Sequence, residues 1–235
     1  MFFPERIKSI KDGDHVLEIG PGSSPFPRAD VLLERRYSSD EEYRLQCGDN
    51  GMQGVDRRTV YYDGGRFPFK DGEFDYIICS HVLEHVPNVE EFCAEVFRVG
   101  KAGYFEYPLV YYEYVYDIPA HLNLMKKVDG ELVYMPKVSL LRPEVAPLRE
   151  FWYAALNAGH VAAVRGLLVC LMEGFEWKEP FKVRPASGIA ELLHPSFDIP
   201  HPLVEEGGIR WYFQGLLKAL FHRVALTRDA LLKRN

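Results

Sequence analysis

The sequence predicts an α/β fold built on a mostly parallel sheet, and three observations support this prediction. Short apolar segments alternate with longer crossover segments through the first hundred residues, which is typical of parallel sheets. One of them, residues 74–80, is almost entirely apolar, as a strand buried on both faces should be. Two glycines, Gly20 and Gly22, directly follow the first apolar segment, where a ligand can approach the backbone of such a sheet.

The composition limits the classes of function. The chain of 235 residues is 47% hydrophobic and 26% charged, which indicates a globular protein and not a disordered or collagen-like one. Its net charge of −6 disfavours nucleic-acid binding through bulk positive charge. The four cysteines include no C-x-x-C pair, which favours a reducing compartment over a zinc site or a disulfide framework. The N-terminal residues also lack the apolar segment of an export signal, so we expect a cytoplasmic protein without a nucleic-acid partner.

Five segments predict the strands and one predicts a helix between the last two. The predicted strands are residues 15–20, 30–34, 59–63, 74–80 and 103–108. Asn88 can cap the predicted helix, because Glu91 follows at the capping-box spacing, and Gly100 is placed to end it. Its apolar face consists of Val89, Phe92, Cys93, Val96 and Phe97. The prediction is a Rossmann-like, doubly wound sheet.

The segment between the first two strands departs from that pattern. Only seven residues separate Gly22 from Asp30, and two of them, Pro25 and Pro27, are prolines. Since proline interrupts a helix, we expect the first helix to be shortened or missing.

The second half of the chain predicts a helical and hairpin elaboration after strand five. Residues 122–128 and 131–135 flank Asp129-Gly130, a preferred type I′ turn, and predict a hairpin. Residues 149–172 predict one long helix, 175–184 a strand and 185–208 a loop. A last helix is expected over 210–233.

The first motif with chemical content is Val16-Leu-Glu18-Ile-Gly20-Pro21-Gly22. Glycines at the carboxyl end of a first parallel strand suit close approach of a ligand, although a plain strand-to-loop turn is the alternative interpretation. The dinucleotide fingerprint needs a third glycine where this chain has Pro25, which disfavours a nicotinamide-dependent oxidoreductase. The carboxylate of Glu18 suits a cation better than a phosphate.

Two further acids follow strands in the same way. Glu34 closes the second predicted strand, where a carboxylate can accept both ribose hydroxyls of an adenosine. Asp63 closes the third and is followed by Gly64, where an adenine amino group can donate. Either acid alone could be a solvated surface residue. Three acidic strand ends in register make a nucleoside site the better interpretation.

The longest motif covers residues 67–87, Phe-Pro-Phe-Lys-Asp-Gly-Glu-Phe-Asp-Tyr-Ile-Ile-Cys-Ser-His-Val-Leu-Glu-His-Val-Pro. Together with the first motif it resembles the class I S-adenosylmethionine-dependent methyltransferases, with their E-x-G-x-G and S-x-V-L-E-H motifs. The resemblance covers about residues 12–110 and implies S-adenosyl-L-methionine as cofactor. It places Glu18, Gly20, Pro21 and Gly22 along the methionine and ribose, Glu34 on the ribose, Asp63 and Gly64 at the adenine, and Ser80 and His81 beside the sulfonium.

The resemblance also directs attention to a general base, which a hydroxyl or protonated nitrogen acceptor requires. His81 and His85 are the catalytic candidates, because the tip of strand four faces the transferred methyl group. A structural hydrogen bond is the competing interpretation for His85, and cofactor packing for His81. Weaker candidates are His121, Glu84, Tyr107 and Glu113. The spacing of His81, His85 and His121 supports no metal site, so we predict none.

The resemblance implies transfer of a methyl group to an oxygen or nitrogen of a small-molecule or glycan-type acceptor. The alternatives are a noncatalytic S-adenosylmethionine-binding scaffold or, less favoured, the oxidoreductase. We assign residues 1–110 to the cofactor-binding half of a single methyltransferase domain and 111–208 to a substrate-side lid. Tyrosines after strand five suit a ring or sugar acceptor, although packing explains them equally well.

A basic amphipathic helix is expected over residues 209–235, with six Lys or Arg and one Asp. Packing on the catalytic domain is one interpretation of its apolar face. A homodimer contact and an anionic membrane surface are the other two.

Overall fold

The computed structural model describes residues 1–47, 57–137, 146–159 and 167–193. The chain divides into two compact units, Met1–His194 and Pro195–Asn235, and the account below concerns the first. The helix predicted over 209–235 lies outside the described residues.

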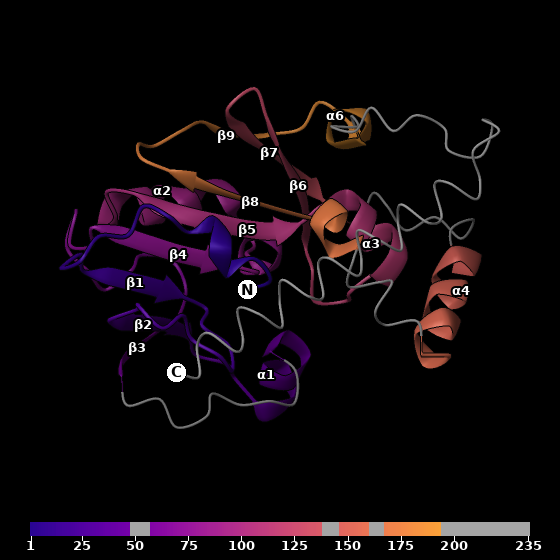
Figure 1. Cartoon of the computed structure of the whole chain (residues 1–235), viewed down its shortest axis with the longest axis horizontal. Helices are drawn as coiled ribbons and strands as arrows, with labels where there is room; N and C mark the ends of the chain where they lie inside the picture. Colours follow the sequence, from indigo (N-terminus) through magenta and orange to yellow (C-terminus); the bar gives the residue numbers. More distant parts are fainter. Residues whose placement is uncertain (48–56, 138–145, 160–166, 194–235) are drawn as a thin grey trace, which may run out of the picture. The chain divides into compact units, whose positions relative to one another are not determined.

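The described residues form a six-stranded mixed sheet that confirms the mostly parallel, Rossmann-like prediction. In Figure 1 the arrows of β1, β4 and β5 point toward α3, whereas β8 runs the opposite way and pairs antiparallel with β5. The carboxyl ends of the parallel strands therefore meet at one edge. In spatial order the strands are β3 (Arg58–Tyr62), β2 (Val31–Arg35), β1 (Val16–Ile19), β4 (Tyr76–Ser80), β5 (Gly103–Pro108) and β8 (Met172–Trp177).

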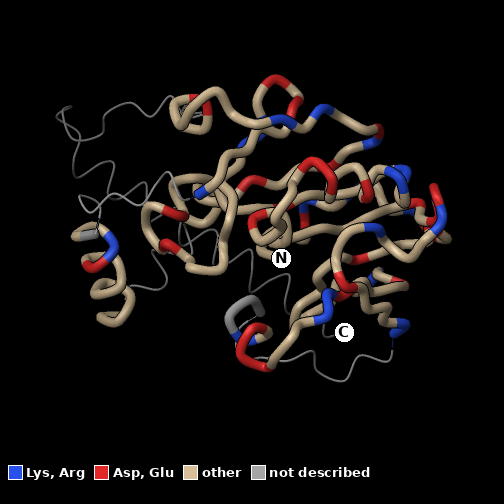
Figure 2. The backbone as a smooth tube through the Cα atoms, turned by 180° about the vertical axis from the view of Figure 1, so that it is seen from behind, with Lys and Arg blue, Asp and Glu red and all other residues tan. Residues whose placement is uncertain are grey.

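The crossover helix between β4 and β5 is α2 (Val89–Val99), and it confirms the predicted caps. The side chain of Asn88 accepts a hydrogen bond from the backbone N–H of Glu91, and the N–H of Gly100 donates to the carbonyl of Val96. The sequence analysis missed α1 (Asp40–Cys47), which precedes β3. Its acidic first turn, visible in Figure 2, complements the helix dipole.

The two faces of the sheet are covered differently. Leu17, Ile77, Phe105 and their neighbours pack against α2 in the larger core cluster. On the other face, Tyr76, Ile78 and Tyr104 pack against Ile7, Ile10 and Phe26. That face is thus covered by the N-terminal segment, which includes the 3-10 helix η1 (Pro4–Arg6), and by the loop before β2.

The described loop from residue 20 to residue 30 contains no helix, which confirms the expected shortening. Its hydrogen bonds come from turns: the backbone N–H of Ala29 donates to Phe26, and that of Asp30 donates to Val16. The two prolines of this loop thus correctly predicted that the first helix is shortened or missing.

The predicted hairpin is confirmed as β6 (Asn123–Val128) and β7 (Glu131–Pro136). Asp129 and Gly130 both have positive φ, +49° and +84°, as a type I′ turn requires. The short strand β9 (Val183–Pro185) pairs in parallel with β7 to complete a second sheet. Between β5 and this hairpin lies α3 (Val110–Tyr116), which the sequence analysis did not predict.

Three expectations for the second half were wrong. The predicted single helix over 149–172 is interrupted: α4 (Ala146–Asn157) is followed by a turn at Gly159, with φ +92°, and residues 167–171 are again helical before β8 begins at Met172. The single strand over 175–184 is divided between β8 and β9. The expected loop after residue 185 contains α6 (Ile189–Leu193). None of the helices in the described ranges is long and apolar enough to cross a membrane.

Candidate active site

A cavity of about 980 Å³ lies where the parallel strands end. This volume is at the upper end of the range of ligand pockets, about 300–1,000 Å³. Every site residue predicted from the sequence lines it except Glu18, and the wall also includes Glu84, Tyr112 and His121. The strand order places these residues there, because β1, β2, β3 and β4 all end at this edge.

The two glycines of the first motif have different roles. Both have positive φ, +61° at Gly20 and +57° at Gly22. A Cβ on Gly20 would stand 2.5 Å from Cγ2 of Val82, so this glycine permits close packing of the β1 end against the residue after β4. A Cβ on Gly22 would meet nothing within 4 Å. Gly22 therefore leaves open space for a ligand in the cavity wall.

Glu18 holds the loop that follows β1. Its carboxylate accepts a hydrogen bond from the backbone N–H of Phe26 at 2.7 Å, and the side chain is 4% exposed. Burial raises the pKa of Glu18 to about 7, although this hydrogen bond opposes the shift. Glu18 itself does not line the cavity, but its carboxylate holds the loop that does.

Glu34 and Asp63 stand at the ends of β2 and β3, on the cavity wall as predicted. The Glu34 carboxylate is 5% exposed and accepts the backbone N–H of Arg35 at 2.9 Å. Burial raises its pKa. Asp63 is exposed at the rim, beside Gly64 with φ +95°. The spacing of these two acids along one wall suits the hydroxyl and amino donors of a nucleoside.

The tip of β4 carries a buried charge network. His81 contacts Glu84 Oε1 from Nδ1 at 3.2 Å and Glu106 Oε1 from Nε2 at 3.0 Å. Burial disfavours the imidazolium, but the hydrogen bonds to Glu106 and Glu84 outweigh it and raise the pKa of His81 to about 9. Both ring nitrogens therefore donate, and no lone pair remains for proton abstraction. These contacts favour charge compensation by His81 over the general-base role predicted from the sequence.

Glu106 is a functional neighbour that the sequence analysis missed. It is fully buried in β5 and accepts hydrogen bonds from Ser80 Oγ at 3.0 Å and Tyr104 OH at 2.7 Å. The backbone N–H of Phe2 donates to it at 2.6 Å, which ties the N-terminal segment to the cavity edge. Burial opposes its ionisation, yet the bonds from His81, Phe2 and Tyr104 lower the pKa of Glu106 to about 2. Only its place at a strand end could have indicated it.

His85 and His121 face one another across a different part of the wall, with ring centroids 4.7 Å apart. Nδ1 of His85 lies 3.0 Å from the carbonyl oxygen of Ala120, and Nδ1 of His121 lies 2.5 Å from Oε1 of Glu113. Since both partners only accept, each Nδ1 carries the proton in the neutral ring and each Nε2 keeps a lone pair. Desolvation is the main cause that lowers the pKa of His85.

The remaining weaker candidate, Tyr107, lies elsewhere. It is buried in the larger core cluster, and its hydroxyl donates to Glu173 at 2.8 Å. This interaction joins β5 to β8, so the structure places Tyr107 in packing and not at the cavity.

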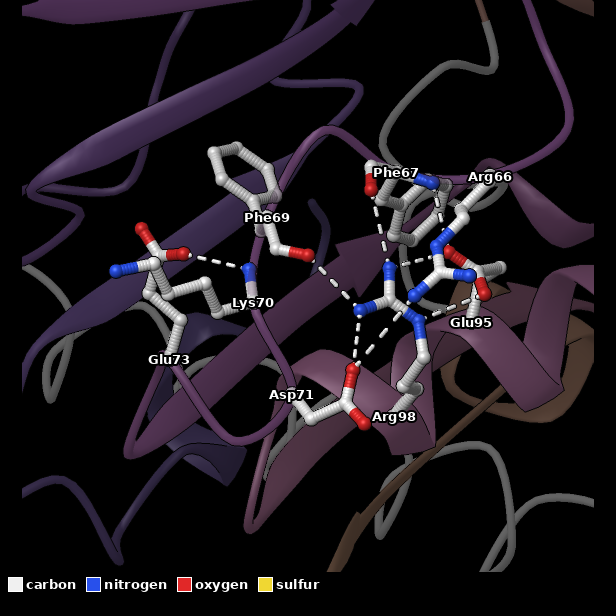
Figure 3. Close-up of polar contacts among 8 residues, drawn as sticks. All are labelled: Arg66, Phe67, Phe69, Lys70, Asp71, Glu73, Glu95 and Arg98. Carbon is white, nitrogen blue, oxygen red and sulfur yellow. Dashed lines mark hydrogen bonds and ion pairs between the residues drawn. The ribbon is translucent and has the colours of Figure 1, made fainter.

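The start of the longest motif has a structural explanation, shown in Figure 3. Arg98 of α2 donates to the carbonyls of Phe67 and Phe69 and to the carboxylate of Asp71. Glu95 pairs with Arg98 at 2.6 Å and accepts the backbone N–H of Phe67 at 2.7 Å. The loop before β4 is therefore held on α2, which fixes one side of the cavity.

Comparison with known families decides the assignment. The model of a family described as "Methyltransferase domain" matches residues 41–105, which contain β3, β4, α2 and β5. Over these residues, which are less than a third of the chain, the sequence matches a methyltransferase domain. This match and the resemblance of the motifs together imply S-adenosyl-L-methionine as the cofactor.

The chain is similar to several curated proteins over part of its length. It is 35% identical over 94 residues to norajmaline N-methyltransferase of Rauvolfia serpentina. The matched segment makes up 39% of this chain and 30% of the relative. The chain is 28% identical over 102 residues to sterol 24-C-methyltransferase erg6 of Schizosaccharomyces pombe, 40% of this chain and 27% of the relative. The chain thus spans less than a third of the length of these relatives.

Solved structures with partial similarity include an S-adenosylmethionine-dependent methyltransferase from Mesorhizobium loti. The alignment has 16% identity and a TM-score of 0.33, and covers 55% of this chain and 59% of that one. A second, from Methanosarcina mazei, has 17% identity and a TM-score of 0.31, with coverage of 51% and 69%.

The residues of the cavity fit the cofactor. The open space at Gly22 admits an aliphatic chain against the backbone, and the buried carboxylate of Glu34 matches a pair of ribose hydroxyls. The volume of about 980 Å³ leaves space for an acceptor as well.

Proposed function

We propose that this methyltransferase transfers a methyl group from S-adenosylmethionine to an oxygen or nitrogen of a small-molecule or glycan-type acceptor. The observation that carries the proposal is a single cavity that both groups of residues line. One group is Gly22, Glu34 and Asp63 for the cofactor, and the other is His85 and His121, whose Nε2 atoms each keep a lone pair.

The protein contributes alignment and a dry site to this reaction. The sulfonium supplies both the methyl group and its leaving group, so the transfer is an in-line displacement that depends on positioning. Ser80 and His81 at the tip of β4 are fixed by Glu106, and Val82 is packed against Gly20. This rigidity supports a fixed approach of the acceptor to the methyl group.

Where the acceptor carries a proton, His85 and His121 are the groups that face it. Each has its Nδ1 held by an oxygen acceptor, which directs Nε2 away from that partner. Tyr112 lines the same part of the cavity, with its ring 6.3 Å from that of His121. An aromatic wall of this kind supports a ring or sugar acceptor.

The named activities of the relatives differ in the acceptor atom that is methylated. One is an N-methyltransferase and another a sterol C-methyltransferase. We propose acceptor recognition by residues 111–208 and cofactor binding by residues 1–110. For the C-terminal segment, packing on the catalytic domain, a homodimer contact and a membrane contact stay the three interpretations. The free thiols of Cys79 and Cys93 accord with a cytoplasmic location.

Ligand binding and turnover test the proposal separately. Calorimetry with S-adenosylhomocysteine should show micromolar binding, whereas NAD should not bind. A metabolite extract incubated with methyl-labelled cofactor should then give a labelled product. Binding of NAD in place of S-adenosylhomocysteine would refute the proposal. Binding of S-adenosylhomocysteine without any labelled product would favour the noncatalytic scaffold.

A further inference from the structure

Glu84, His85 and His121 form a cluster whose chemistry the methyl transfer itself does not require. Each offers one ligand atom, and these atoms lie within 4.8 Å of one another. The ligand atoms of a single bound ion lie about 3–3.5 Å apart, so binding of an ion requires a small adjustment of these side chains. Two imidazoles and one carboxylate are a donor set that suits divalent transition metals.

The Glu84 carboxylate is incompletely satisfied. The side chain is fully buried, and its Oε1 accepts from Nδ1 of His81 at 3.2 Å. Its Oε2 is buried without a hydrogen-bond partner among the described residues. A buried carboxylate oxygen without a partner is costly, and a cation satisfies it.

The two histidines are oriented as metal ligands are. In known sites the ligating imidazole donates its other N–H to a carboxylate or a backbone carbonyl. His121 does so to Glu113, and His85 does so to the carbonyl of Ala120. Glu113 is itself buried and paired with Lys137 Nζ at 2.7 Å. The hydrogen bonds at Nδ1 thus fix the orientation of each imidazole ring and, with it, the direction of Nε2.

The backbone holds the three residues in one arrangement. The N–H of Leu122 donates to the carbonyl of Glu84 at 2.6 Å, and Nδ2 of Asn123 donates to the carbonyl of Val86 at 2.7 Å. These bonds, on either side of His85, join the segment after β4 to the start of β6. His121 is thus placed opposite Glu84 and His85 by contacts that involve none of the three side chains.

We propose that Glu84, His85 and His121 bind a divalent transition-metal ion, such as Mn²⁺ or Zn²⁺, in the wall of the cavity. Three protein ligands leave coordination positions open toward the cavity, which is the pattern of catalytic and not structural sites. Resting on the proposed function, this site selects an oxygen acceptor, since a hydroxyl that binds the ion is polarised and releases its proton to solvent water more readily. His85 and His121 then act as ligands of the ion and not as bases.

Metal binding by the full-length, chelator-treated protein tests the proposal. Titration with Mn²⁺ alone, followed by electron paramagnetic resonance, and with Zn²⁺ alone, followed by calorimetry, should show one ion per chain. Glu84→Gln and His121→Ala should abolish this binding. Glu113→Gln, which keeps the ligands and weakens their support, should reduce the affinity by about 10–100-fold. His15→Gln, which removes an imidazole that does not line the cavity, should leave it unchanged.

Affinity for S-adenosylhomocysteine, measured on the same variants, separates this proposal from the assigned function and reports whether each variant folds. Retained S-adenosylhomocysteine binding with lost metal binding supports the site. Absence of metal binding in the wild type, or equal binding in Glu84→Gln and the wild type, overturns the metal site and leaves the methyltransferase assignment intact. Loss of metal binding in His15→Gln alone would place the ion elsewhere and also overturns it.

Discussion

Nε2 of His81 donates to Oε1 of Glu106 at 3.0 Å, and the backbone N–H of His81 donates to the Glu106 carbonyl at 2.8 Å. This double link joins the end of β4 to β5 at the edge of the cavity. His81 also has φ +58°, a conformation that few non-glycine residues adopt, so the surrounding contacts must hold it there. The pair therefore holds the geometry of the site at the end of β4.

Replacing His81 with asparagine should destabilise the fold more than it impairs chemistry. Asparagine tolerates positive φ but leaves Glu84 and Glu106 buried without their counter-charge. We expect the free energy of unfolding to fall by about 3 kcal/mol. Turnover should fall by less than the roughly 10²–10⁴-fold expected for a missing base. Chemical denaturation and steady-state assays measure the two effects.

A second substitution provides the control for His81→Asn. Adding Glu106→Gln in the same chain removes one of the uncompensated charges and should restore part of the lost stability. A large loss of turnover in His81→Asn that added imidazole rescues would instead show that His81 is the base.

Glu18 should make the stability of the protein depend on pH. Its pKa rises from 4.5 to about 7 on folding because the carboxyl group is buried. The stabilisation from the protonated form is complete below the unfolded value and is lost as the pH rises through the folded value. Glu18→Gln keeps an acceptor for the Phe26 N–H and removes the titration. Relative to wild type, the variant should gain about 3 kcal/mol of unfolding free energy between about pH 4 and pH 8.

Denaturant titrations at several pH values test this expectation. The gain should develop in the window between about pH 4.5 and pH 7 and should be constant above it. Parallel stability curves for the two proteins across that window would contradict it. The Glu42→Gln variant is a suitable comparison, since Glu42 is also a glutamate with a shifted pKa but in the opposite direction.

Local rules explain what the sequence predicted well. The strand at Gly103–Pro108, the cap at Asn88 and the type I′ turn at Asp129 each depend on a few neighbouring residues. The strand ends that bear Glu34 and Asp63 followed from the parallel order of the sheet, which places carboxyl ends at one edge. Predicting these features required no knowledge of contacts between residues distant in the sequence.

The unpredicted features depend on distant partners. The hydrogen bond from Phe2 to Glu106 joins residues 104 positions apart, and the sequence around neither residue predicts it. His121 and Glu113 meet only because the chain reverses between α3 and β6. The expected long helix failed for a different reason, since apolar periodicity over 149–172 concealed the left-handed turn at Gly159.

Arg98→Met should loosen the loop before β4. Methionine keeps the aliphatic stem but removes the donors to Phe67, Phe69 and Asp71 (Figure 3). Loss of several charge-assisted bonds should lower the free energy of unfolding by about 2–4 kcal/mol. Hydrogen exchange of the amides in residues 66–73 should accelerate. Arg66→Met is the control, because the ion pair of Arg66 with Asp71 at 3.9 Å is exposed, and it should leave both measurements unchanged.

Gly22→Ala should separate cofactor binding from folding. At φ +57° an alanine is strained by about 1 kcal/mol, and its Cβ would enter the open space that we assign to the cofactor. Gly13→Ala is a matched control, since Gly13 has φ +89°, no atom within 4 Å of the position that a Cβ would take, and no place in the cavity wall. Both variants should lose similar stability in thermal denaturation. Only Gly22→Ala should lose affinity for S-adenosylhomocysteine, by at least about tenfold, which corresponds to roughly 1.4 kcal/mol. Equal affinities in the two variants would show that the cofactor does not approach the backbone at Gly22, and the position assigned to its methionine part would have to be abandoned.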